Sequence, residues 1–198
     1  LNRNKIVSLG EDDSDIRSGQ GNTIIQRVGN PINSYMLLKV ERTLRTDDFE
    51  ADGITPKKGI AIYAGQKPGD TKWVDKTKDG KITSDDYDVV GSYQPKFEWG
   101  FTNTFKYKDF DLVIELQYSC GSKIYWDGLG TCAMRQGIAN SLSMVLDTWT
   151  PENQGATLEQ IRPSNAYYNS LKDDARLYNG SFLSLIHISE PTRRTPIS

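Results

Sequence analysis

The chain has 198 residues, of which 36% are hydrophobic, and 24 Lys and Arg against 26 Asp and Glu give a formal net charge of −2. No apolar run approaches the ~18 residues that a membrane-spanning helix needs, and no basic stretch indicates a nucleic-acid partner. The composition suits a soluble protein, and it also suits a transmembrane β-barrel, in which only alternate strand residues face lipid. Because the chain begins at Leu1 with no visible signal peptide, we expect any targeting signal to lie upstream.

Three short apolar segments come first in the chain. Residues 5–9, 23–28 and 34–42 are predicted strands, and a Gly-Asn-Pro turn signal at 29–31 separates the second from the third. Residues 43–96 are mostly turn formers and charged residues. The region before residue 97 is therefore predicted to hold a strand end and a long loop region.

The clearest pattern lies at residues 97–120, where apolar and polar residues alternate over two stretches on either side of Lys108 and Asp109. This period of two predicts a β-hairpin. The apolar residues that share one face are Phe97, Trp99, Phe101, Phe105, Tyr107, Phe110, Leu112, Ile114, Leu116 and Tyr118. Each strand matches the ~9–11 residues that a tilted strand needs to cross a bilayer, whereas soluble strands are nearer 5–6 residues long.

Aromatic residues gather at both ends of this hairpin, as they do in the aromatic girdles of membrane barrels. Phe97 and Trp99 lie at one end, and Tyr107 and Phe110 flank the turn. An amphipathic hairpin from a soluble β-sandwich is the alternative that the pattern leaves open.

Beyond the hairpin, residues 121–180 hold turns, aromatics and one possible helix near residues 138–149, and a further strand is predicted to start near residue 180. After Leu185 the chain reads IHISEPTRRTPIS, whose two prolines disfavour a continuing strand. This tail resembles translated sequencing-adapter sequence, so it is predicted to be non-native. It contains the only histidine, His187, which disfavours any mechanism with a histidine base.

Several segments resemble the C-terminal barrel region of the SusC/RagA family of TonB-linked outer-membrane proteins. Gly29-Asn30-Pro31-Ile32 with Ser34-Tyr35 resembles the family's GxPIxSxY stretch. Residues 68–112 resemble its most recognisable block, with Pro-Gly-Asp, an Asp-rich DGKI loop, a Val-Val-Gly-Ser step and Pro-Lys-Phe leading into the hairpin. WTPEN at 149–153 and NGSFLSL at 179–185 follow in the family's order.

The resemblance implies an all-β fold, an incomplete fragment of a large transmembrane antiparallel β-barrel with long extracellular loops. The complete barrel would have about twenty-two strands and a plugged lumen. Such proteins are TonB-dependent receptors of the bacterial outer membrane that import glycan fragments, or in some members peptides. They work with a SusD-like surface lipoprotein and with the TonB complex, which contacts an N-terminal region absent from this chain.

The predicted topology follows from the rule that short turns face the periplasm and long loops face outward. The turn at Lys108-Asp109 would be periplasmic, with Asp109 in the position that favours a positive φ. The predicted divisions are a strand end plus extracellular loop region with the Asp-rich loop at 1–96, a transmembrane β-hairpin at 97–120, an extracellular loop at 121–180, the start of the next strand at 181–185 and the non-native tail at 186–198.

The Asp-rich segment at residues 75–86 has the spacing of a calcium-binding loop. Its predicted ligands for Ca²⁺ are the side chains of Asp75, Thr77, Asp79 and Asp86 and the carbonyl of Lys81, with Gly80 at the sharp turn. Thr77 replaces the usual Asp or Asn, and Asp86 replaces the usual bidentate Glu. The alternative is an Asp/Gly turn held by side-chain-to-backbone hydrogen bonds.

Tyr125, Trp126 and Trp149 fall in the predicted outer loop, where they could stack on sugar rings or serve only in loop packing. Glu98, Asp111 and Glu115 are the carboxylates that a glycoside hydrolase would need, but no catalytic motif accompanies them, so we expect no enzyme. Two other functions stay open, a soluble secreted calcium-dependent carbohydrate-binding β-domain and a surface glycoside hydrolase fragment.

Overall fold

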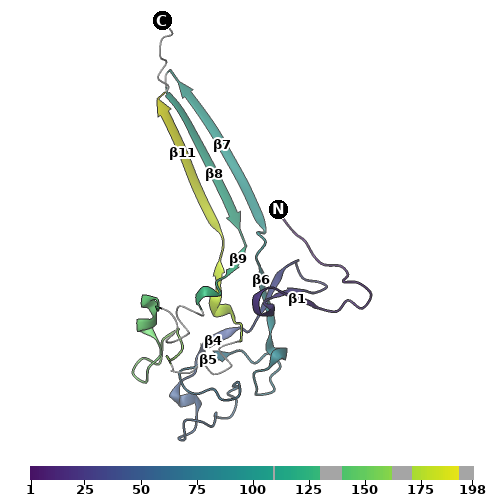
Figure 1. Cartoon of the computed structure of the whole chain (residues 1–198), viewed down its shortest axis with the longest axis vertical. Coiled ribbons are helices and arrows are strands. Elements are labelled where there is room, and N and C mark those ends of the chain that lie inside the picture. Colours follow the sequence, from purple (N-terminus) through teal and green to yellow (C-terminus); the bar gives the residue numbers. More distant parts are fainter. Residues whose placement is uncertain (109, 130–139, 162–170, 192–198) are drawn as a thin grey trace.

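The structure is a computed structural model that describes residues 1–108, 110–129, 140–161 and 171–191, with backbone pairing only for 187–191. A long three-stranded sheet extends from a loop-rich base, and the N-terminus lies beside the point where the two meet (Figure 1). Among the described residues no helix is long and apolar enough to cross a membrane.

The long sheet, which we call the amphipathic sheet, consists of β7 (Phe97–Tyr107), β8 (Phe110–Cys120) and β11 (Phe182–Pro191) in the antiparallel order β11-β8-β7. The β7–β8 pair runs without a register shift from Phe97 opposite Cys120 to Tyr107 opposite Phe110. The predicted hairpin at 97–120 is present with the predicted strands. Lys108 takes a positive φ of 52° at the turn, while Asp109, for which that conformation was predicted, lies outside the described residues.

The base contains three smaller sheets. Its four-stranded sheet has the order β1-β2-β3-β6, and two-stranded ladders join β4 to β5 and β9 to β10. The strands are β1 (Ile16–Ser18), β2 (Ile24–Gln26), β3 (Ser34–Leu37), β4 (Val40–Thr43), β5 (Thr71–Trp73), β6 (Asp88–Ser92), β9 (Lys123–Tyr125) and β10 (Leu177–Asn179). Short 3-10 helices are η1 (Gln20–Asn22), η2 (Thr46–Asp48), η3 (Ser84–Asp86), η4 (Ser143–Asp147) and η6 (Asp174–Arg176).

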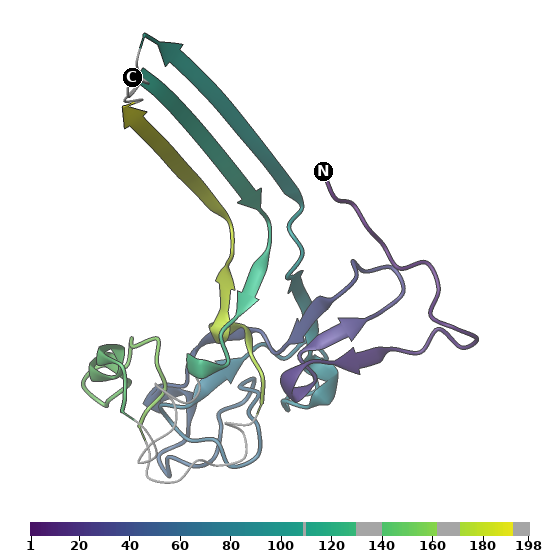
Figure 2. The ribbon, with the colours of Figure 1, turned by 45° about the horizontal axis from the view of Figure 1, so that its top comes forward.

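The hydrophobic core sits in the base. Leu38, Ala61, Trp73 and Ile82 form a buried cluster, flanked by partly buried side chains that include Tyr63 and Tyr87. The segment after residue 171 joins this core because Leu38 N donates to Lys172 O at 3.0 Å and Asp174 N donates to Leu38 O at 3.0 Å. Residues more than 130 positions apart therefore share one core, while the amphipathic sheet lies outside it (Figure 2).

The short strands of the base differ from those predicted. Residues 5–9 form no strand. The single strand predicted at 34–42 is instead two strands, β3 and β4, which belong to different sheets. β5 and β6 lie in the region predicted to be loop. Each is five residues or shorter, so the alternation that marks a strand hardly develops.

The C-terminal part of the chain also differs. The predicted helix near residues 138–149 lies partly outside the described residues, and the rest of it contains only η4. The backbone of β11 pairs with β8 as far as Pro191, so the strand continues past residue 185, its predicted limit. The non-native origin of residues 186–198 stays a prediction.

Candidate functional site

The amphipathic sheet carries an apolar face that no other described segment covers. Phe101 stands opposite Leu116, and its side chain is 49% exposed. Phe105 stands opposite Leu112, and both are also exposed. β11 extends this face with Leu183 and Leu185, which pair with Tyr118 and Leu116. The predicted sharing of one face by the apolar residues of both hairpin strands is therefore correct.

Aromatic side chains mark the two ends of this face. At the end nearer the base, the ring of Tyr118 lies 6.2 Å from that of Phe97 and 6.1 Å from that of Trp99. At the turn, Tyr107 pairs with Phe110, and both are about two-thirds exposed. Leu112, Ile114 and Leu116 of β8 occupy the middle opposite Phe105, Asn103 and Phe101 of β7, so Asn103 is the one polar residue that β7 and β8 place on this face. Aromatic residues at both ends and mostly apolar residues between them are typical of a transmembrane strand surface.

The opposite face of β7 and β8 is polar. Thr102 stands opposite Glu115, and Lys106 stands opposite Asp111 with Nζ 3.8 Å from Oδ2. β11 departs from this pattern because Phe182 and Ile186 fall on the polar face and are exposed. The polarity of the sheet is therefore clear for the hairpin and mixed for its third strand.

An exposed face of this kind is costly in water. Monomeric soluble proteins rarely expose a contiguous apolar patch of more than a few hundred Å², and burying apolar surface contributes about 25 cal/mol per Å². The outer edges of β7 and β11 also lack a partner strand within the described residues. The sheet therefore needs an apolar partner for this face, either lipid or another protein layer, and neighbouring strands for its edges.

The three carboxylates that a glycoside hydrolase would need, on Glu98, Asp111 and Glu115, do not form a close pair. Asp111 and Glu115 lie four residues apart on β8, about 13 Å at ~3.3 Å per residue. Glu98 stands opposite Ser119, again four residues from Glu115. A glycosidase places its two carboxyl groups ~5–9.5 Å apart, so this arrangement does not suit glycoside hydrolysis.

The Asp-rich loop is held together by its own carboxylates. Asp75 accepts the backbone N–H groups of Lys78 at 2.5 Å and Gly80 at 2.9 Å. Asp86 Oδ1 accepts from the N–H groups of Lys76 and Thr77, and its Oδ2 accepts from Thr83 N at 2.7 Å. This geometry is what the Asp/Gly-turn alternative describes.

Asp86 is the central residue of this loop, with 1% of its surface exposed. Burial raises its pKa, but hydrogen bonds from the backbone of Thr83 and from Thr77 and Lys76 outweigh burial and hold the pKa below its ordinary value. Among the described residues no three acidic, His or Cys side chains converge on a metal position. Calcium binding by Asp75, Thr77, Asp79, Lys81 and Asp86 stays a prediction.

The three predicted ligand-binding aromatics have different surroundings. Trp149 is only 2% exposed, so it serves loop packing instead of sugar stacking, and its ring fills the space above Gly69. Tyr125 is half-buried 6.2 Å from Tyr35, and burial raises its pKa to about 12. Trp126 is 42% exposed, with its ring 5.9 Å from the equally exposed Tyr178. Trp126 and Tyr178, the second of which the sequence analysis missed, form the aromatic pair available to a ligand.

A buried acidic cluster beside Trp73 was also missed. Asp70 and Asp173 are almost fully buried, Trp73 Nε1 donates to Asp173 Oδ2 at 3.2 Å, and Thr71 Oγ1 donates to Glu159 Oε2 at 3.3 Å. Burial, followed by the charges of Asp70 and Asp173, raises the pKa of Glu159 to about 7. No sequence signal marks this cluster, because its members come from three distant segments.

The sequence of the chain is similar to parts of longer curated proteins. No family model matches the chain. Among curated proteins of Formosa agariphila, TonB-dependent receptor P3 is 28% identical over 195 residues, or 95% of this chain, and TonB-dependent receptor P26 is 30% identical over 180 residues, or 84% of it. The chain matches one part of TonB-dependent receptors. It spans 18% and 17% of the lengths of these two receptors.

Solved structures agree on the fold. A chain of the RagAB peptide importer in its closed-closed state aligns with a TM-score of 0.61 at 18% identity, covering 91% of this chain and 18% of that chain. The open-open state gives a TM-score of 0.60, also at 18% identity, with 90% and 18% covered. The predicted resemblance and the all-β, unclosed sheet architecture are therefore confirmed. Because the curated relatives are TonB-dependent receptors, the prediction that the chain is not an enzyme is confirmed as well.

Proposed function

We propose that this chain forms part of the wall and outer loops of a TonB-dependent importer in the bacterial outer membrane. The observation that carries the proposal is the exposed, aromatic-banded face shared in register by β7, β8 and the start of β11. The similarity to TonB-dependent receptors over nearly the whole chain supports it.

The strand length agrees with this role. β7 has 11 residues, which at ~3.3 Å per residue extend about 36 Å. With the ~40° tilt of barrel strands, the rise along the membrane normal is about 28 Å, close to the ~25 Å apolar band of outer-membrane barrels. We assign the turn after Tyr107 to the periplasm and the base to the cell exterior, because short turns are periplasmic in such barrels.

The substrate and partners that we propose belong to the complete receptor. Small oligomers, either glycan fragments or peptides, would cross with the help of a SusD-like surface lipoprotein and energy from the TonB complex. The fold shared with the RagAB peptide importer supports a peptide substrate, and the SusC/RagA-like motifs at residues 68–112 support either class. On the outer surface, Trp126 and Tyr178 would stack on the arriving ligand.

The membrane placement can be tested by site-directed labelling of the complete receptor in lipid nanodiscs. Cys120 and Cys132 are first replaced by Ser, and a single Cys carrying an environment-sensitive fluorophore is then introduced at position 101 or 102. We expect lipid-borne nitroxide to quench the label at 101 strongly and the label at 102 weakly, because these residues lie on opposite faces. Equal quenching at both positions, or none at 101, would overturn the proposal.

A further inference from the structure

Residues 148–160, which we call the latch segment, lie against the base and are folded mainly on themselves. Trp149 N donates to Leu158 O at 2.9 Å, and Ala156 N donates to Asn153 O at 3.3 Å. The β-bridges of the segment, between residues 148 and 158 and between residues 150 and 153, are likewise internal to it. Single contacts therefore decide whether the segment stays on the base.

Neutral contacts hold both ends of the latch segment. The buried ring of Trp149 lies above Gly69, where an added Cβ would come within 2.7 Å of its Cε3 atom. At the other end, Gln160 N donates to Gly69 O at 2.7 Å. Between them, Thr43 Oγ1 donates to Ala156 O at 3.0 Å. None of these groups ionises, so these contacts alone would give docking that does not depend on pH.

Glu159 is the ionisable side chain that the latch segment brings into this contact. Its Oε2 atom accepts from Thr71 Oγ1 of β5 at 3.3 Å. Glu152, the other acidic residue of the segment, is exposed. A neutral hydroxyl compensates an ionised carboxylate only weakly for the water that it loses on docking. The docked position therefore favours a protonated Glu159.

Charged groups from two other parts of the base face Glu159. Asp70, directly before β5, and Asp173, directly before η6, are both almost fully buried and repel a negative charge, whereas Arg176 of η6 attracts it more weakly. Burial first, and then the charges of Asp70 and Asp173, raise the pKa of Glu159 to about 7. In the docked segment its carboxyl group therefore ionises close to neutral pH.

We propose that residues 148–160 are a pH-dependent latch, docked on the base in acid and released above neutral pH as Glu159 gives its proton to the solvent. Release returns the carboxylate to water and removes it from Asp70 and Asp173. Trp149 and Gln160 leave Gly69 in the same movement, because they lie on the same short segment. If the base faces the cell exterior, which rests on the proposed function, the latch responds to the pH of the medium.

Docking of the latch segment and ionisation of Glu159 oppose each other. The ordinary pKa of the carboxyl group is 4.5, which applies to the released segment, whereas docking raises the pKa to about 7. The released segment therefore loses its proton first, and the equilibrium constant for docking falls as the pH rises from about 4.5 to about 7. Between pH 5 and pH 8 the expected fall is roughly tenfold to a hundredfold.

Hydrogen exchange in the complete receptor, followed by mass spectrometry at pH 5 and pH 8, tests the latch. The reporter is the backbone N–H of Gln160, which donates to Gly69 O in the docked segment. After correction for the intrinsic exchange rate, its protection should fall roughly tenfold to a hundredfold between the two pH values. At pH 8 it should be at least tenfold less protected than the N–H of Leu38 in the core, because release precedes unfolding.

Two matched variants separate Glu159 from other effects of pH. Glu159→Gln cannot ionise but keeps an oxygen that can accept from Thr71, so the protection of Gln160 should be the same at pH 5 and pH 8. Glu152→Gln makes the same chemical change at an exposed position of the segment. It should retain the pH dependence of the wild type.

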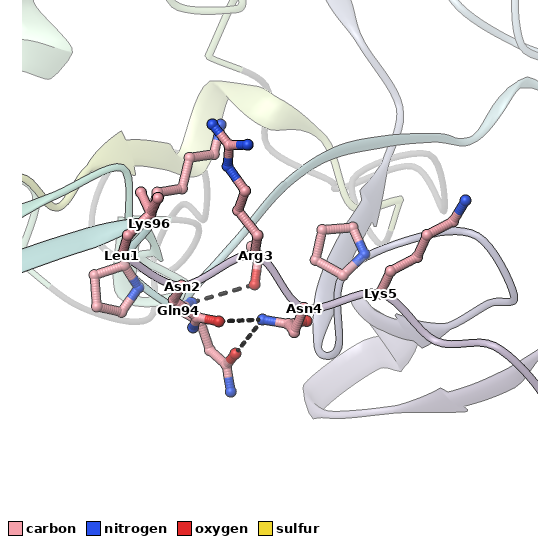
Figure 3. A pocket seen from close by; sticks show the side chains of 10 residues that line it. Leu1, Asn2, Arg3, Asn4, Lys5, Gln94 and Lys96 are labelled. Carbon is pink, nitrogen blue, oxygen red and sulfur yellow. Dashed lines mark hydrogen bonds between the residues drawn. The ribbon is translucent and has the colours of Figure 1, made fainter.

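The N-terminal segment supplies an internal control. Ile32 N donates to Asn4 Oδ1 at 2.7 Å, and Asn4 Nδ2 donates to Gln94 Oε1 at 3.0 Å, as Figure 3 shows. Both acceptors are neutral amides, so the opening of this contact should not respond to the charge of Glu159.

Three results would contradict the latch. They are a fall in protection at Ile32 as large as that at Gln160, the wild-type pH dependence in Glu159→Gln, and equal protection of Gln160 and Leu38 at pH 8. Exchange reports docking alone, so such a failure leaves the proposed transport role untouched. A failure of the membrane-labelling experiment would in turn leave the latch untouched.

Discussion

Replacing Phe101 by Arg distinguishes a lipid-facing sheet from a soluble one. Phe101 is the fifth of the eleven residues of β7, so it lies near the middle of the apolar face. Its neighbours across the strands are Leu116 and, beyond it, Leu185. An arginine here would place a guanidinium close to the bilayer midplane without an acidic partner on the same face.

The expected cost of Phe101→Arg in the complete receptor is about 2–4 kcal/mol of unfolding free energy, the depth-dependent value for Arg at the midplane of a barrel. Thr102→Arg is the matched control. Its new side chain would point to the polar face opposite Glu115, and we expect its effect to stay within about 0.5 kcal/mol. The loss of unfolding free energy should therefore be several times larger for Phe101→Arg than for Thr102→Arg.

Guanidinium titration of the receptor refolded into vesicles, followed by tryptophan fluorescence, measures both variants. Phe101 is already half-exposed in this chain, so a sheet that faced water would lose little on either substitution. Equal unfolding free energies for Phe101→Arg and Thr102→Arg would refute the assignment of the two faces. A loss of unfolding free energy for Thr102→Arg alone would reverse the assignment of the two faces.

Further predictions concern the base. Gly69→Ala should cost about 1–3 kcal/mol in thermal unfolding, because its Cβ would approach Trp149 Cε3 to 2.7 Å at a φ of +89°. Gly59→Ala has the same φ and open space, so it should cost only the backbone part, about 1 kcal/mol, and equal losses would contradict the packing role of Trp149. Asp86→Asn should destabilise the loop by about 1–3 kcal/mol at pH 7. Because the folded-state pKa of Asp86 is lowered, the stability advantage of the wild type should be present above pH ~4 and lost as the pH falls below that value. Thermal melting of both proteins at pH 3–7 measures this difference. The pKa of Glu159 is raised to about 7, so stability should fall as pH rises from about 4.5 through 7, and Glu159→Gln should remove this slope in the same assay. If the loop at 75–86 binds calcium, millimolar Ca²⁺ should raise the melting temperature relative to chelator, whereas identical melting would leave the Asp/Gly turn as its whole role.

The hairpin could be predicted from sequence because all its information is local. Each strand alternates over about ten residues and the two strands adjoin in the chain, so the pattern alone fixes which residues share a face. Long-range pairs determine the base instead. Ser34 pairs with Ser92, and Leu38 bridges to Asp173, so no window of sequence contains both partners.

The same distinction explains the errors at individual sites. Trp149 was a reasonable ligand-binding candidate in a loop, but Gly69, eighty residues earlier, leaves the space that buries its ring. The acidic spacing of residues 75–86 is local and was recognised. Whether its carboxylates point to a cation or to backbone N–H groups depends on three-dimensional geometry, and here Asp86 accepts from Lys76, Thr77 and Thr83.

The hydrophobic core of the base and the amphipathic sheet are separate, so the predictions for substitutions in the base are independent of the prediction for Phe101→Arg in the sheet. The base buries Trp73 and Leu38 without any contribution from the apolar face of β7 and β8, so its stability does not require that face to be covered. Gly69→Ala should therefore lower the melting of the base equally in detergent and in lipid. Phe101→Arg should act only where hydrocarbon surrounds the strands. A sheet whose apolar face served a protein core would instead couple the two substitutions, and their effects would not add.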